Sequence, residues 1–181
     1  MAKIGLRNLR YSVLDEDDKV TTAKTFGKAI SCKVSIETNS AELFADDGLA
    51  ESDYTFQKGT VELGVDEDAD EVFAEVLGHD IAEDGEVIRK ATDIAPFVAI
   101  GRILTKIVNG KYRYKVEYLS KVKFKEPSND ETTKGESVEF GTTTIEGSVQ
   151  QLADGTWSKA KTFDTYAEAE EYLNGLLTAT A

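Results

Sequence analysis

Cysteine, histidine and proline are nearly missing from this chain of 181 residues, which has one, one and two of them. The single cysteine, Cys32, can form no disulfide within the chain and cannot build a cysteine cage for zinc. The single histidine, His79, excludes the HExxH pattern and His-rich metal sites. The sequence also contains no Walker loop and no GxGxxG segment. We therefore expect neither a metal site nor a bound cofactor.

Long apolar runs and basic residues are scarce as well. No apolar run approaches the ~20 residues that cross a bilayer, and the opening MAKIGLRNLR lacks the apolar core of a signal peptide. These absences predict a soluble protein outside the secretory route. Lys and Arg number 21 against 34 Asp and Glu, for a net charge of −13. That balance argues against a protein that grips duplex DNA, because affinity for phosphate comes mainly from clustered Lys and Arg.

The negative charge is unevenly distributed along the chain. Glu37–Asp93 holds eighteen acids and three bases, whereas Ile94–Lys125 holds eight bases and one acid. Two interpretations stay open on charge alone. The blocks are solvated faces, or an acidic surface on one copy meets a basic surface on the next.

The apolar pattern predicts strands over most of the chain. The length suits a single domain over residues 1–181, and 40% apolar residues argue against disorder. Apolar and polar residues alternate over Ile30–Ile36 and again over Val61–Val65, the period of a half-buried strand. Together with two helical segments, this predicts a mainly β fold with flanking helices (α+β).

Two hairpins are predicted from turn residues. Asn109-Gly110 separates the β-rich runs Phe97–Val108 and Lys111–Phe124 and favours a type I′ turn, in which both residues have positive φ. Asp154-Gly155 predicts a second hairpin between Thr142–Leu152 and Thr156–Phe163, with Trp157 as a candidate core residue.

Two helices are predicted at about 68–77 and about 166–177. In the first, apolar residues recur at helical spacing, acids crowd the first turn, and Gly78 suits the position after the end. In the second, Thr165 and Glu168 have the spacing of a capping box.

The segment at about 38–58 has few periodic signals and is predicted to be a long extended connection. About twenty residues is longer than a compact domain needs, and such segments tend to be functional or disordered. Its apolar and aromatic residues argue against plain disorder: Leu43, Phe44, Leu49, Tyr54 and Phe56.

No group of residues carries a reaction mechanism. His79 beside Asp80 resembles a base held by a carboxylate, but no Ser stands in a GxSxG turn. The acids from Asp66 to Asp70 resemble the start of an EF-hand, yet the sixth position is Glu71 rather than Gly. A helix start explains those acids better, and we expect no enzymatic activity. Lys121, Lys123 and Lys125 are interpreted as protection of an edge strand rather than a nucleic-acid patch.

Several segments, in collinear order over nearly the whole chain, resemble the major tail proteins of long-tailed, siphovirus-type bacteriophages of Gram-positive hosts. They are Gly5–Leu14 (GLRNLRYSVL), Ser40–Asp47 (SAELFADD), Leu77–His79, Asp93–Gly101 (DIAPFVAIG), Val122–Phe124, Thr133–Phe140 (TKGESVEF), Ile145–Gly147 and Asp154–Trp157.

The resemblance implies a structural virion protein with a tail-tube-type β-sandwich. Sheets of six copies would join into a hexameric ring, and the rings would stack into a hollow tube around a tape-measure protein. Tail tip and tail terminator proteins would be further partners, and genomic DNA would pass through as transient cargo during ejection. The location implied is the virion, after assembly in the host cytoplasm.

Two expectations follow for the assembled tube. The segment at 38–58 would be the inter-ring contact arm, with its aromatic residues buried only on assembly. Acids rather than Lys would face the bore, since a basic lining would retard DNA. The alternation Arg113, Lys115, Glu117 on one predicted strand is in tension with a simply acidic wall.

The alternative function is a monomeric β-sandwich binding module, for carbohydrate as an example. It would use exposed aromatic residues as a platform, from among Tyr112, Tyr114, Tyr118 and Trp157.

Overall fold

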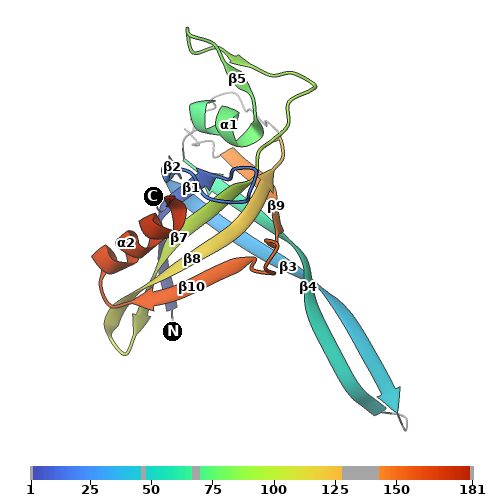
Figure 1. Ribbon diagram of the computed structural model, residues 1–181. Helices are drawn as coiled ribbons and strands as arrows, with labels where there is room; N and C mark the ends of the chain where they lie inside the picture. The colour runs from blue at the N-terminus through green and yellow to red at the C-terminus, as the bar shows by residue number, and fades with distance from the viewer. Residues whose placement is uncertain (1, 46–47, 67–69, 128–142, 180–181) are drawn as a thin grey trace, which may run out of the picture.

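The computed structural model describes residues 2–45, 48–66, 70–127 and 143–179, with side chains for all of these except 2–3, 41–45 and 48–53. The elements in these ranges are β1 (Ala2–Val13), β2 (Lys24–Gly27), β3 (Ala29–Ala45), β4 (Gly48–Val65), α1 (Asp70–Leu77), β5 (Asp80–Ile81), β6 (Val87–Ile88), β7 (Val98–Val108), β8 (Lys111–Phe124), β9 (Thr143–Gln150), β10 (Ser158–Phe163) and α2 (Tyr166–Leu177). The protein is therefore a β-rich α+β fold, which confirms that part of the expectation (Figure 1).

One antiparallel sheet organises the molecule. Its strand order is β2-β1-β7-β8-β9-β4-β3, and β10 pairs with β8 outside this path. The short strands β5 and β6 form a separate two-stranded sheet. The β3–β4 end crosses behind the β7–β8–β10 part of the sheet in Figure 1.

The larger core lies where the sheet and α1 enclose apolar side chains. It takes its residues from six strands of the main sheet and from α1, and all of them are at most 5% exposed: Leu9, Tyr11, Phe26, Val61, Leu63, Val65, Phe73, Val76, Leu77, Val98, Ile100, Leu119, Val122, Phe124, Ile145 and Val149. The alternation predicted at Val61–Val65 is thus confirmed as one buried face of β4.

A second core lies under α2, on strands β7 and β8. Ala169, Leu173 and Leu177 of α2 are fully buried there, against residues that include Ile103 and Val116. The helix starts where the sequence predicts, because the Thr165 side chain accepts from the Glu168 backbone N–H and the Glu168 side chain accepts from the Thr165 backbone.

The first hairpin is confirmed and the second is wrong. Asn109 and Gly110 have φ of 51° and 76° and connect β7 to β8. The turn at Gly155 also forms, with φ of 82°, but β9 and β10 do not pair with each other. Both lie along β8 instead, β9 beside its end at Lys121–Phe124 and β10 beside Tyr114–Leu119. The turn residues determined the reversal of the chain, while the choice of partner came from the long strand β8.

The segment at 38–58 is extended, but it is not an unpaired connection. Residues 38–45 continue β3 and residues 48–58 begin β4, in register from Thr38↔Phe56 to Ala45↔Gly48. Backbone pairing with the facing strand supplies the order that periodicity did not reveal.

Three more predictions can be compared with the structure. The helix predicted at about 68–77 is described from Asp70 to Leu77, and Gly78 follows it with φ of 78°. A register shift between Ala29 and Ser31 breaks the expected alternation, so Ile30 is 53% exposed. The segment Thr133–Phe140 lies outside the described residues. No helix in the described part of the chain is long and apolar enough to cross a membrane.

Candidate assembly surface

A two-stranded ribbon extends from the body of the protein, and we call residues 37–58 the arm. Strand β4 pairs with β9 only from Gly59 to Val65, whereas its pairing with β3 continues from Glu37↔Lys58 outward to Ala45↔Gly48. Beyond Gly59 the ribbon therefore has no third strand among the described residues. Figure 1 shows the arm leading away from the sheet.

The five residues expected to form the contact surface all lie on this arm. Phe44 and Leu49 are opposite each other in the register, close to the tip. The side chains of Leu43, Phe44 and Leu49 lie outside the described part of the structure. Tyr54 is 59% exposed, as an unburied contact residue should be.

Phe56 departs from the expectation that the arm's aromatic residues are buried only on assembly. Its ring stacks on Trp157 with centroids 5.1 Å apart and planes at 7°. Trp157 is itself partly buried against the larger core. Phe56 therefore anchors the root of the arm inside the subunit, and Tyr54 is the aromatic side chain of the arm that stays accessible in the described structure.

The arm has little to hold it in place by itself. An isolated two-stranded hairpin is marginally stable in water, because it lacks a face packed on other elements. The described arm side chains are exposed except that of Phe56, and Glu37 and Lys58 form an ion pair at 3.3 Å. Both outer edges of the ribbon leave backbone N–H and C=O groups without strand partners in the described structure. A partner that covers such a ribbon would therefore stabilise it, because the partner would pair these backbone groups.

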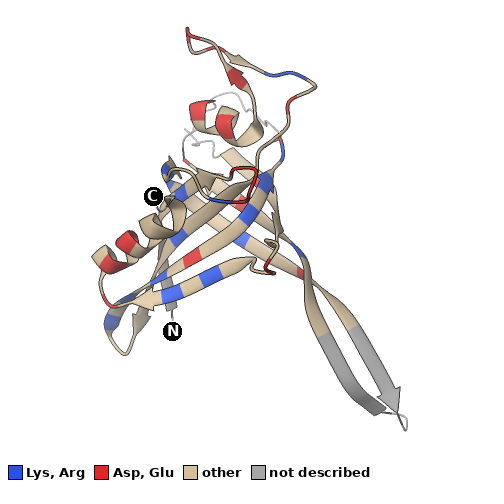
Figure 2. Cartoon of the chain, viewed as in Figure 1, with Lys and Arg blue, Asp and Glu red and all other residues tan. Residues whose placement is uncertain are grey.

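Strand β10 offers another open edge. It pairs with β8 from Ser158↔Leu119 to Phe163↔Tyr114, and no strand in the described ranges pairs with its other side. Lys159 and Lys161 on this strand are exposed. Figure 2 shows these two basic positions on β10 and an uncharged stretch between them.

Charges inside the sheet compensate one another. Glu117 contacts the Arg102 guanidinium and the Lys115 ammonium, each at 2.6 Å, and the Arg102 side chain is 8% exposed. Arg113 is ion-paired with Asp164. The mixed alternation seen in the sequence is thus a set of ion pairs, rather than a row of free cations. Burial raises the pKa of the Cys32 thiol, which lies beside this cluster.

The carboxylates beside His79 belong to Asp93 and Glu126, and not to its sequence neighbour Asp80. His79 Nδ1 lies 2.7 Å from Asp93 Oδ2, and Nε2 lies 2.5 Å from Glu126 Oε1, whereas Asp80 is ion-paired with Lys90. The Lys90 backbone N–H, together with His79, holds the pKa of Asp93 below its ordinary value. The two carboxylates lie on opposite sides of the ring, so this arrangement fixes the loop after α1 to the end of β8.

A cavity of about 670 Å³ lies beside α1, and three of its polar side chains, Tyr11, Lys24 and Glu75, contact one another. The Tyr11 hydroxyl donates to Glu75 Oε2 at 2.5 Å, and Lys24 is ion-paired with the other oxygen. Burial is the main cause that raises the pKa of Tyr11 above its ordinary value. Among the described residues, no three His, Cys, Asp or Glu side chains are placed to hold a metal ion.

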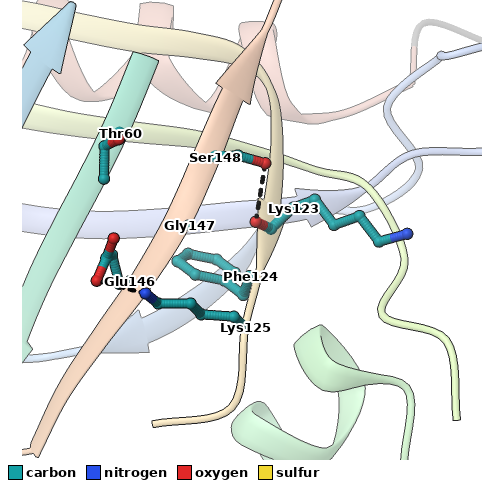
Figure 3. A pocket seen from close by; sticks show the side chains of 7 residues that line it. All are labelled: Thr60, Lys123, Phe124, Lys125, Glu146, Gly147 and Ser148. Carbon is teal, nitrogen blue, oxygen red and sulfur yellow. Dashed lines mark hydrogen bonds and ion pairs between the residues drawn. The ribbon is translucent and has the colours of Figure 1, made fainter. Parts of the chain in front are cut away.

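The lysines at the end of β8 do not protect an edge, because β8 is an interior strand between β7 and β9. Lys121 contacts both carboxylate oxygens of Asp18, at 2.6 and 2.7 Å. Lys125 is paired with Glu146 at 2.7 Å, across the shallow groove of about 280 Å³ shown in Figure 3. Lys123 reaches away from this pair in the same view. Two of the three cations are therefore neutralised locally.

The aromatic residues considered for a carbohydrate platform do not form one exposed surface. Tyr112 is 59% exposed, Tyr118 is 6% exposed, and Tyr114 and Trp157 are half-buried. Tyr114 packs edge-on against Tyr166 of α2, with ring centroids 5.6 Å apart. These side chains mostly belong to the packing between the sheet and its neighbours.

No protein-family model matches the chain, and no curated protein matches it.

Proposed function

We propose that the chain is a structural subunit that assembles with copies of itself into a hollow tube, as the major tail proteins of long-tailed phages do. The arm is the observation that carries the proposal. It is a long ribbon with two open edges and an exposed Tyr54, joined to a body that has its own buried cores. Such a ribbon is stabilised when a partner covers it, and in a polymer it can reach the next copy.

The remaining parts of the proposal rest on the sequence resemblance. They are the tail-tube-type sandwich, a hexameric ring, stacking around a tape-measure protein, contacts with tail tip and terminator proteins, and DNA as cargo in the virion. The absence of enzymatic activity belongs to the same proposal. The structure adds support at one point: the open strand edges of the arm and of β10 provide the means for sheets of separate copies to join.

Electron microscopy of the purified protein tests the proposal. We expect rings or tubes at high protein concentration, since a head-to-tail contact closes into a ring or extends into a filament. A protein that stays monomeric at about 20 kDa in size-exclusion chromatography, and gives neither rings nor tubes, would contradict it.

Replacement of residues 43–54 by a short Gly/Ser turn tests the arm itself. We expect a folded subunit that gives single rings or monomers and no long tubes. The matched control replaces the exposed turn 83–86, which belongs to the β5–β6 hairpin, by Gly and Ser. Tubes of ordinary length from the arm variant would show that the arm is not the inter-ring contact.

The charge of the bore stays a prediction. Acids should outnumber unpaired Lys on the lumen wall, because the cations at Arg102, Arg113 and Lys115 are already ion-paired within the subunit. A net positive lumen in a reconstructed tube would overturn this expectation.

A further inference from the structure

Strand β10 leaves an open edge at the place where the sheet divides. On the side of β8 away from β7, β9 occupies one half and β10 the other. The stacked pair Phe56–Trp157 lies at the fork between them, where β4 turns away into the arm. The outer edge of β10 faces no strand of its own chain in the described ranges, so its backbone groups can take a further strand.

Both lysines on this edge are exposed, and among the described acids Asp154 interacts electrostatically with Lys159. The Lys159 ammonium lies 6.0 Å from the Tyr118 ring centroid, and the Lys161 ammonium lies 5.0 Å from the Phe163 centroid. No ion pair is described for either lysine, whereas Arg113 and Lys115 nearby each contact a carboxylate. Lysines on an open edge repel a basic or neutral strand and attract an acidic one.

The arm has the complementary charge. Its two strands carry Glu37, Glu42, Glu51 and Asp53 against the single base Lys58. It also has open strand edges of its own. Figure 1 shows the arm and β10 of one chain diverging from the fork, so the arm of the same copy does not cover this edge.

We propose that the arm of one copy docks along the open edge of β10 of a second copy, with its acids against Lys159 and Lys161. This inference rests on the proposed function, because it names the surface that receives the arm in the tube. The contact is heterologous, since donor and acceptor are different parts of the chain. Each copy therefore receives one arm and gives one, and the assembly extends.

Charge reversal tests the docking in full-length protein. K159E with K161E should slow tube elongation at least about tenfold, because repulsion replaces attraction at encounter. Adding E51K and D53K to the same chain should restore elongation to within about threefold of the unmodified protein. The control K19E with K28E makes the same change in net charge at side chains 71% and 85% exposed, and it should elongate normally. Unchanged elongation in K159E/K161E, or no restoration by the swap, would overturn the proposal.

Cross-linking tests the same contact without requiring tubes. Two preparations carry Cys32→Ala; one adds Asp53→Cys and the other, with a size tag, adds Lys161→Cys. After mixing and mild oxidation we expect a disulfide-linked pair of the two species, at least about fivefold more abundant than with Lys28→Cys in place of Lys161→Cys. No enrichment overturns the docking even if tubes form. Enrichment without rings or tubes in the unmodified protein supports the docking and contradicts the tube function.

Discussion

The two ends of strand β4 lie in opposite surroundings, one inside the body and one on the arm. From Gly59 inward, Val61, Leu63 and Val65 are completely buried between β3 and β9. From Lys58 outward, the same strand has only β3 beside it, and Tyr54 is 59% exposed. The backbone is extended and paired at both ends, so secondary structure alone does not separate them. What differs is whether a face of the ribbon lies against other side chains.

This difference determines where the free energy of folding comes from. Burial of apolar surface is worth about 25 cal/mol per Å², and the body collects it in two cores on either side of β7 and β8. The arm buries little in the described structure beyond Phe56 against Trp157. Changes in the body should therefore alter the stability of the subunit, and changes in the arm should alter assembly.

The largest expected effect is that of Leu173→Ala in the body. Leu173 is fully buried between α2 and the sheet, and its Cδ1 atom occupies the space beside Gly101. Removing it should lower the free energy of unfolding by about 3 kcal/mol, through lost burial and the cavity left behind. Urea denaturation measures the change.

The arm counterpart of that variant is Tyr54→Ala, which also removes a large side chain. We expect a change of less than about 0.5 kcal/mol in the subunit, because Tyr54 is exposed. The same variant should impair tube elongation. Equal destabilisation by the two substitutions would mean that the arm is packed within the subunit, and the contrast would fail.

Two glycines give the next largest effect. Gly78 has φ of 78°, and a Cβ there would lie 2.3 Å from the Ile94 carbonyl oxygen. Gly78→Ala should therefore lower the free energy of unfolding by about 2 kcal/mol or more. The left-handed φ strains any residue with a Cβ, and this Cβ would also clash with the Ile94 carbonyl. Gly85 has φ of 88° but nothing within 4 Å of a Cβ, so Gly85→Ala should cost only about 1 kcal/mol. Thermal unfolding of both variants compares them, and equal shifts would show that the clash at Gly78 is relieved.

Local signals were sufficient for the helices and the first turn. The capping residues Thr165 and Glu168 are three apart, and Asn109-Gly110 holds the two positive φ angles in adjacent residues. In each case the interacting groups are neighbours in sequence. Their geometry depends little on the rest of the chain, so the sequence predicted helix α2 with its correct bounds and the β7–β8 hairpin to within one residue.

Pairing between distant segments was not predictable in the same way. Strand β10 pairs with β8 rather than with β9, and His79 meets Asp93 rather than its neighbour Asp80. Both outcomes depend on which elements the fold brings together. For the arm, the sequence predicted extension, but not that the ribbon is paired or that Phe56 stacks on Trp157. Aromatic residues look alike in sequence whether their partner belongs to the same copy or to another.

A smaller effect is expected at the start of α2, where the body is held by local hydrogen bonds. Thr165→Ala removes the hydroxyl that accepts from the Glu168 N–H and should lower the free energy of unfolding by about 1 kcal/mol. Thr178→Ala, at the other end of the helix, removes an exposed hydroxyl that has no such role and serves as the control. Urea denaturation should separate the two, and indistinguishable midpoints would show that the cap is not stabilising.

The smallest expected effect lies on the arm, at the ion pair between Glu37 and Lys58. The two charged groups are 3.3 Å apart, with side chains 56% and 59% exposed, and exposed pairs of this kind are worth about 0–1 kcal/mol. Lys58→Ala should therefore leave the unfolding midpoint of the subunit almost unchanged at 0.15 M salt, because the pair joins β3 and β4 only at the exposed root of the arm, outside the packed body. Lys58→Ala also makes the arm more acidic, so that tube elongation should be as fast as in the unmodified protein or faster if the arm meets Lys159 and Lys161 of another copy. A clear loss of stability together with slower elongation would place the energetic root of the arm at this ion pair instead of at the Phe56–Trp157 stack.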